Sequence, residues 1–143
     1  MTTQVSVQDR ILKPIEEVYD AIVDPEKMSG YFISRASKKI EKPETIIWYF
    51  DDYGVEFPIY IKKLTPNESI VFEWDASGKM ATVEISLERK EANRTEVKIT
   101  EVGWELTEEG VARALQQTQG WTDFICSLKA YLYTRINLRK GEF

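Results

Sequence analysis

The sequence has no histidine and only one cysteine, Cys126, among its 143 residues. Structural and catalytic zinc sites are built mainly from Cys and His, so a Cys/His zinc site is excluded. A Ser-His-Asp or Cys-His catalytic arrangement is excluded for the same reason. Glycine-rich phosphate-binding patterns are also missing. We therefore expect no metal ion and no cofactor.

Two weaker signals for chemistry are interpreted as structural. The acidic stretch "DDYGVE" at 51–56 lacks the ligand spacing of a calcium loop, and we interpret it as a solvated turn. Cys126 is expected on the outer shoulder of a helix, with no base near it in sequence, and we interpret it as an idle thiol.

Long apolar runs are also missing. No stretch approaches the ~20 apolar residues of a membrane span, and the N-terminus "MTTQVSVQDR" lacks a signal-peptide pattern. With no disulfide to form within the chain, a reducing cytoplasm is the expected location. The net charge of −5 argues against nucleic-acid binding, which needs a positive surface.

What is present is typical of a globular protein. Hydrophobic residues make up 43% and charged residues 30% of the chain, and a length of 143 residues fits a single domain over 1–143. Aromatic residues reach 12%, with four Trp, and such a surplus is typical of a large core or of a ligand pocket.

The hydrophobic pattern changes period along the chain. Residues 4–12 alternate as a strand does, 14–23 have helical spacing, and Asp24-Pro25 separates a short second helix over 25–31. Six strands are predicted after it, at 34–41, 45–50, 55–64, 70–74, 81–90 and 95–104, most of them separated by turn residues. Pro58 requires an edge or bulge position. Alternation indicates one buried and one solvated face of the sheet.

A long helix from Thr107 to about 138 is the element left to cover that buried face. Thr107 is a good N-cap and acidic residues follow it. Its inward stripe is predicted to be Val111, Ala114, Thr118, Trp121, Ile125, Leu128, Leu132 and Ile136, with Phe124 and Tyr131 as a shoulder. Arg113, Gln116, Asp123, Ser127 and Thr134 are predicted to face outward. Gly120 costs about 1 kcal/mol relative to Ala in a helix, which predicts a kink or a close backbone approach there.

Four segments resemble one family. They are "KPIEEVYDAIVDPEKMSGYF", "LTPNESIVFEW", "TEVKITEVGWE" and "GWTDFICSLKAYL". In this order they are similar to the Hsp90 ATPase activator homologue 1 type family within the START-like superfamily. The resemblance implies an α+β helix-grip fold of order β-α-α-β6-α, in which a curved antiparallel sheet wraps around a long C-terminal helix. Two positions depart from the family: Lys13 replaces a frequent Ser, and Glu101 stands where many relatives have His.

The resemblance leaves several functions open. Its superfamily includes proteins that bind lipids, polyketides or other small hydrophobic molecules, whereas its eukaryotic namesake activates the chaperone Hsp90. We expect binding of a hydrophobic or amphipathic molecule, such as a lipid, polyketide or flavonoid, between sheet and helix. The alternatives are a cochaperone-like partner of an Hsp90-type ATPase, and a cyclase or hydrolase that uses carboxylate and Tyr groups. Monomer and homodimer both remain open.

The expected ligand-binding residues share inward positions on the strands and the last helix. They are Trp48, Phe57, Phe72, Trp74, Val83, Ile85, Val97, Ile99, Glu101, Thr118, Trp121 and Ile125. Glu101 is the most informative of them, because alternation from Val97 and Ile99 aims a carboxylate at the buried face. It is either a polar anchor in a cavity or a strand-end residue that reaches solvent or pairs with Arg or Lys.

Overall fold

The structure is a computed structural model that describes residues 1–140. Its strands are β1 (Thr2–Ile11), β2 (Arg35–Ala36), β3 (Thr45–Phe50), β4 (Val55–Thr65), β5 (Ser69–Ala76), β6 (Lys79–Glu91) and β7 (Arg94–Glu105). Its α-helices are α1 (Ile15–Val23), α2 (Pro25–Met28) and α3 (Glu108–Thr134), and short 3-10 turns span Asp51–Tyr53 and Leu138–Lys140.

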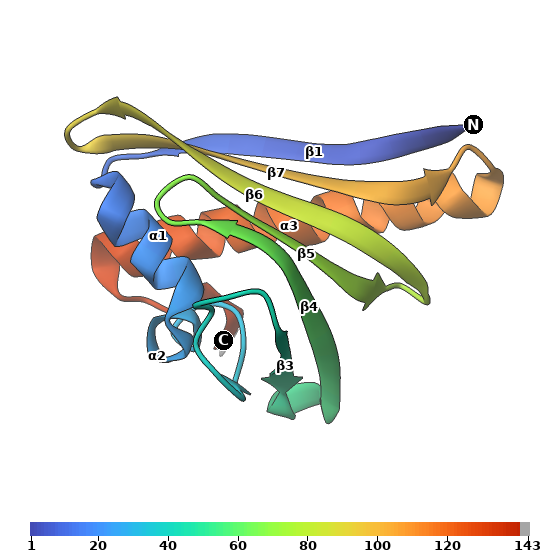
Figure 1. Ribbon diagram of the computed structural model, residues 1–143, viewed down its shortest axis with the longest axis horizontal. Coiled ribbons are helices and arrows are strands. Elements are labelled where there is room, and N and C mark those ends of the chain that lie inside the picture. The colour runs from blue at the N-terminus through green and yellow to red at the C-terminus, as the bar shows by residue number, and fades with distance from the viewer. Residues whose placement is uncertain (141–143) are drawn as a thin grey trace.

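The strands form one antiparallel sheet of seven strands in the order β1-β7-β6-β5-β4-β3-β2. The sheet curves around α3, which lies along its concave side, and α1 and α2 close one end (Figure 1). This is the predicted helix-grip arrangement of class α+β. The strand pair that is most distant in the sequence is β1 with β7, in which Thr2 lies opposite Glu105 and Ile11 opposite Thr95.

Local sequence explains where the elements begin. The Asp24 side chain accepts a hydrogen bond from the Glu26 backbone N–H at 3.0 Å and caps α2. Thr107 accepts one from the Gly110 N–H at 3.0 Å and caps α3, as predicted. Pro58 has a neighbouring strand on one side only, because β5 pairs with β4 from Tyr60 onward.

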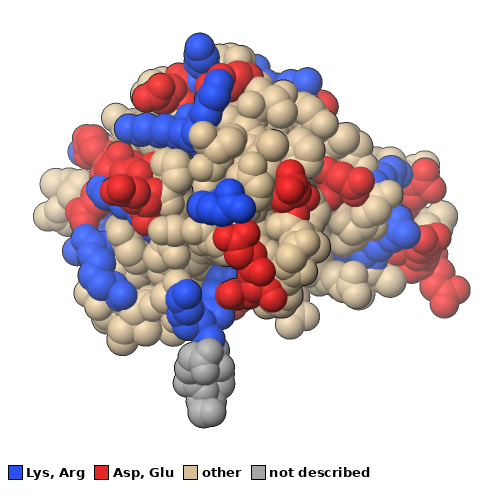
Figure 2. All heavy atoms as spheres, turned by 90° about the horizontal axis from the view of Figure 1, so that it is seen from below, with Lys and Arg blue, Asp and Glu red and all other residues tan. Residues whose placement is uncertain are grey.

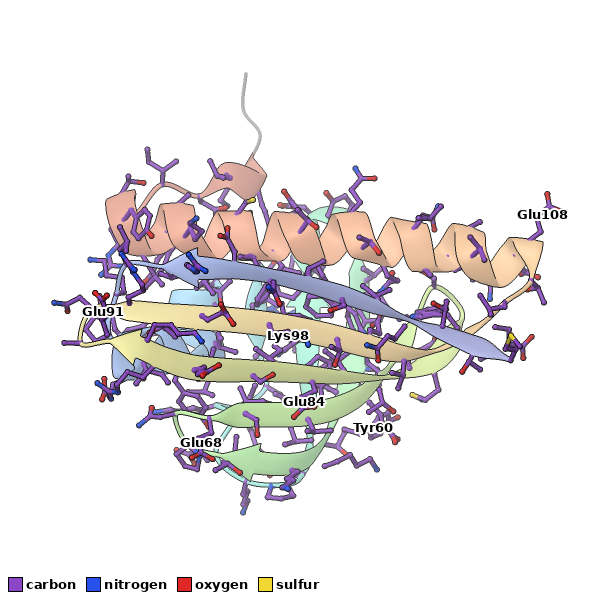
Figure 3. All side chains as sticks on the ribbon, turned by 90° about the horizontal axis from the view of Figure 1, so that it is seen from above. Tyr60, Glu68, Glu84, Glu91, Lys98 and Glu108 are labelled. Carbon is purple, nitrogen blue, oxygen red and sulfur yellow. The ribbon has the colours of Figure 1, made fainter. Side chains whose placement is uncertain are left out.

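The two faces of the sheet differ as the alternation predicts. Val83, Ile85, Val97 and Ile99 are all buried against the helix. Polar side chains such as those of Glu84 and Lys98 project from the outer face (Figure 3).

The predicted strand at 34–41 is wrong over most of its length. Only Arg35–Ala36 pairs with β3. After Ser37 the chain leaves the sheet edge, and the Ile40 N–H donates to the Val23 carbonyl at 3.1 Å. Ile40 is thereby buried beside α1, and burial of this isoleucine replaces further strand pairing.

The predicted faces of α3 need four corrections. Val111 is 40% exposed rather than inward. Ile136 is 58% exposed, because the helix ends at Thr134 and Arg135 takes a left-handed conformation as its C-cap. Ser127 is buried rather than outward, and Phe124 is fully buried rather than on a shoulder. The cause at Phe124 is a second cover, because the rings of Tyr31 and Phe32 pack on it with centroids 5.5 and 4.8 Å away.

Candidate functional site

Glu101, on β7, is fully buried with 0% of its surface exposed. The Trp74 indole N–H donates to one carboxylate oxygen at 2.8 Å, and the Gln117 amide donates to the other at 2.9 Å. The inward direction predicted from alternation is therefore confirmed. The alternative, in which Glu101 reaches solvent or pairs with a cation, is wrong: none of the ion pairs within residues 1–140 includes it.

A bulge in β7 brings a further indole to the carboxylate. The register of β1 against β7 shifts between Thr3 and Gln4, which lie opposite Trp104 and Val102. The residue between them, Gly103, has φ +122°, a conformation that side chains disfavour. The extra residue places Trp104 on the same buried face as Glu101, although simple alternation would place it outside.

Burial raises the pKa of Glu101 above its ordinary value, and hydrogen bonds from Trp74 and Gln117 act against that rise. The indole N–H groups of Trp121 and Trp104 also lower this pKa, but in smaller measure. Neither of them forms a well-directed hydrogen bond to any group within residues 1–140. The carboxyl is thus surrounded by neutral N–H donors, three of them indoles, with a net rise in its pKa.

The predicted wall residues pack on one another instead of enclosing a wide space. The ring centroids of Trp48 and Phe72 are 5.4 Å apart, and those of Phe72 and Trp121 are 6.5 Å apart. Trp121 also reaches Trp74 at 5.7 Å, so the helix touches the sheet directly. Ile125 is buried as well, while Phe57 and Thr118 are half-buried. Aromatic side chains fill the region where we expected a cavity.

A small recess does remain at the edge of this cluster. It has a volume of about 130 Å³ and is lined by Phe32, Trp74, Gln117, Gly120, Trp121 and Arg139. Trp74 and Trp121 are almost fully buried and form its inner wall, whereas Gly120 is exposed at its rim. Because Trp74 and Gln117 both hold Glu101, the buried carboxylate lies directly behind the recess wall.

Arg139 forms the boundary between this recess and a larger, more polar pocket. Its guanidinium carbon is 5.2 Å from the centre of the Phe32 ring, and its Nη1 donates to Asp123 at 3.0 Å. The neighbouring pocket, of about 440 Å³, shares Phe32 and Arg139 with the recess and includes Ser34, Asn137 and other polar residues. Apolar and polar spaces therefore meet at one side chain.

The prediction did not place Phe32, Trp104, Gln117 or Arg139 in the site. Gln117 had a detectable signal, since it precedes Trp121 by four residues and so shares its helix face. Trp104 was hidden by the bulge at Gly103. Phe32 and Arg139 come from loop and 3-10 segments, for which sequence periodicity gives no direction.

The close backbone approach predicted at Gly120 is wrong. α3 runs through it from Glu108 to Thr134 without interruption, and a Cβ at this position would meet nothing within 4 Å. The missing side chain leaves the rim of the recess open. Cys126 is exposed on the outer face of α3, as predicted.

Acidic and basic side chains are spread over the described surface outside the recess. Among residues 1–140, no three Asp, Glu, Cys or His side chains are placed to share a metal ion. On the face seen in Figure 2, basic and acidic side chains are interspersed, without the continuous positive area that a phosphate backbone needs. None of the helices described is long and apolar enough to span a membrane.

The arrangement also bears on catalysis. A cyclase or hydrolase of the kind considered above needs a Tyr hydroxyl beside Glu101. The two side chains that donate hydrogen bonds to this carboxylate are instead Trp74 and Gln117. These groups can hold and orient a ligand, but they exchange no proton with it near neutral pH.

The fold and the site define a START-like helix-grip protein with a largely filled interior. The family model described as Activator of Hsp90 ATPase homolog 1-like protein matches residues 13–133. The chain therefore belongs to this family, as its sequence motifs indicated. Comparison with curated proteins gives no significant match.

Many solved structures are similar to this chain, among them the following three. A protein of Staphylococcus saprophyticus has 30% identity and a TM-score of 0.83, with 96% of each chain covered. DynU16, a putative protein in the dynemicin biosynthetic locus, has 26% identity and a TM-score of 0.80 over 92% of this chain and 47% of its own. The Aha1 dimer from Colwellia psychrerythraea, at 21% identity and a TM-score of 0.78, covers 93% of this chain and 98% of its own, and shows a shared fold.

Proposed function

We propose that this protein binds an amphipathic small molecule, whose apolar end enters the recess at Trp74 and Trp121. The observation that carries the proposal is an open aromatic recess directly backed by a buried carboxylate. Ligand sites commonly combine aromatic walls with a few fixed polar groups. A buried carboxyl held by neutral donors costs stability, which favours a role in recognition over a purely structural one.

The size of the recess limits what can enter. About 130 Å³ is below the ~300–1,000 Å³ of pockets that enclose a drug-sized ligand. It suits one ring or one branched alkyl group, and the rest of the ligand would lie in the polar pocket beyond Arg139. DynU16 is a putative protein in a biosynthetic locus, and this setting is consistent with a small-molecule ligand of this kind.

The test is a fragment screen on the ¹⁵N-labelled protein, read from the indole N–H signals. Small aromatic and branched alkyl compounds should shift the signals of Trp74 and Trp121 in a saturable way. Gly120→Leu places a side chain at the rim and should weaken this binding, whereas Gln119→Leu, on the neighbouring exposed position outside the recess, should not. Binding that is unaffected by Gly120→Leu, or no binding at all, would contradict the proposal.

Membership of the family favours a second candidate, a cochaperone-like interaction with an Hsp90-type ATPase. Under this hypothesis the interior serves only as a core and the protein surface carries the function. The measurement is the ATPase rate of an Hsp90-type chaperone with and without this protein. A changed rate that survives Gly120→Leu would separate this function from ligand binding, and an unchanged rate would count against it.

A further inference from the structure

Three aromatic rings from three separate segments face the recess. Phe32 follows α2, Trp74 is near the end of β5, and Trp121 is on α3. The Phe32 and Trp121 planes meet at 36°, and those of Trp74 and Trp121 at 48°, with centroids 6.3 and 5.7 Å apart. Such tilted neighbours form a concave wall, and aromatic faces carry negative charge density that attracts cations.

One wall of the recess already contacts a cation of the protein itself. The Arg139 guanidinium lies 5.2 Å from the Phe32 ring centre and is held there by Asp123. With 27% of its side chain exposed, Arg139 is near enough to solvent to be displaced. Its position indicates that the electrostatic field at this wall suits a positive group.

The carboxylate behind the wall gives an independent reason. Buried carboxylates are normally paired with a cation. Among residues 1–140, Glu101 receives well-directed hydrogen bonds only from Trp74 and Gln117, and both are neutral. A positive group in the recess would supply the missing charge across a single layer of side chains, where low polarity strengthens the attraction.

We propose that the recess selects an organic cation, an alkylammonium or quaternary ammonium group, over a neutral group of the same shape. Arg139 competes for this position and so determines specificity. A trimethylammonium group is of the size that about 130 Å³ admits. This inference rests on the proposed function, because it requires the recess to be the ligand site.

The test compares choline with 3,3-dimethylbutan-1-ol, in which carbon replaces the ammonium nitrogen and the shape is preserved. Titrations of the unmodified protein, followed by the indole N–H signals of Trp74 and Trp121, should give choline the tighter binding by roughly tenfold, the scale of a desolvated cation–π contact. Equal or tighter binding of the alcohol would overturn the preference for charge and leave the proposed function standing. If neither compound binds, the proposed function itself fails for these groups.

Variants locate the source of the selectivity. Glu101→Gln should reduce choline binding severalfold and lower the ratio of choline affinity to alcohol affinity. Arg139→Ala should strengthen choline binding by removing the internal competitor, whereas Lys98→Ala, which removes an exposed cation on the outer face of the sheet, should not. Choline binding that ignores both Glu101→Gln and Arg139→Ala would contradict the inference. Thermal unfolding of each variant shows whether it is folded. The ratio of choline affinity to alcohol affinity in the unmodified protein does not depend on any variant.

Discussion

At the scale of single residues, the buried carboxyl of Glu101 links the stability of the protein to pH. Its carboxyl is fully buried on β7 and its pKa is raised by burial. The groups facing it are Trp74 from β5, Trp104 from β7, and Trp121 and Gln117 from α3, none of which titrates in the acidic range. The difference in pH dependence between the unmodified protein and a Glu101 variant can therefore be assigned to this one carboxyl.

The direction in which stability changes with pH follows from the difference between the pKa of Glu101 in the folded and in the unfolded state. In the unfolded chain Glu101 ionises near its ordinary pKa, whereas the folded protein retains the proton to higher pH. The folded state therefore binds more protons in that interval, and its contribution to stability falls as pH rises from the unfolded pKa through the folded one. Glu101→Gln should remove this loss, so its stability relative to the unmodified protein should increase from pH 4 to pH 7. Urea unfolding at several pH values measures the free energy of unfolding of both proteins. A parallel pH dependence of the two would contradict this prediction.

Two glycines of α3 make a matched pair for a second residue-scale prediction. A Cβ on Gly110 would lie 2.0 Å from the Glu105 carbonyl oxygen, a backbone atom that cannot move away cheaply. Gly110→Ala should therefore destabilise the protein by roughly 1–3 kcal/mol, the scale of overpacking. Gly120→Ala meets nothing within 4 Å and should stabilise by about 1 kcal/mol through helix propensity. Chemical denaturation compares them, and a stabilising Gly110→Ala would show that the helix start is not held so closely.

At the scale of elements, α3 is the part on which the site depends most. It supplies Gln117, Gly120 and Trp121 to the recess, and the first turn of the helix is capped by Thr107. One cap contributes only a small part of the stability of a helix of 27 residues. The cap nevertheless fixes the residue at which the helix begins, next to Glu105.

Thr107→Ala should cost about 1 kcal/mol of folding stability, because the Gly110 N–H loses its acceptor. Thr122→Ala is the control, since the Thr122 hydroxyl donates only to the Thr118 carbonyl within the exposed helix face. The two variants can be compared by thermal unfolding with circular dichroism. A larger loss in Thr122→Ala than in Thr107→Ala would contradict the assigned role of the cap.

At the scale of the whole molecule, the filled interior sets a limit on the ligand. The space between sheet and helix is taken by rings in contact, such as Trp48, Phe72 and Trp121. No long-chain lipid should therefore copurify with the protein under mild conditions. Native mass spectrometry and solvent extraction test this, and a stoichiometric fatty acid or phospholipid would contradict the packing described.

The sequence predicted the architecture well because period and alternation are direct consequences of a one-sided sheet. The buried positions of Trp48, Phe72 and Glu101 follow from that rule. The prediction from sequence failed wherever the direction of a side chain depends on residues distant in the chain. Gly103 changes the parity of β7 and thereby moves Trp104 inside, which alternation cannot express. Ser127 is buried on a face of α3 that we predicted to be outward, because helix periodicity does not show what covers each face.

The pairing of β1 with β7 also has a consequence for the order in which the protein can be made. Thr2 finds its partner only at Glu105, so the first strand leaves the ribosome long before the strand beside it exists. During synthesis, at about 5–20 residues per second, the apolar side of β1 waits for several seconds without its neighbour. The emerging chain then needs α3 as well, which follows β7 in the sequence, before the concave side of the sheet is covered. Closure of the sheet therefore comes late in the synthesis of this domain, and the apolar face of β1 stays uncovered until β7 and α3 have both been made.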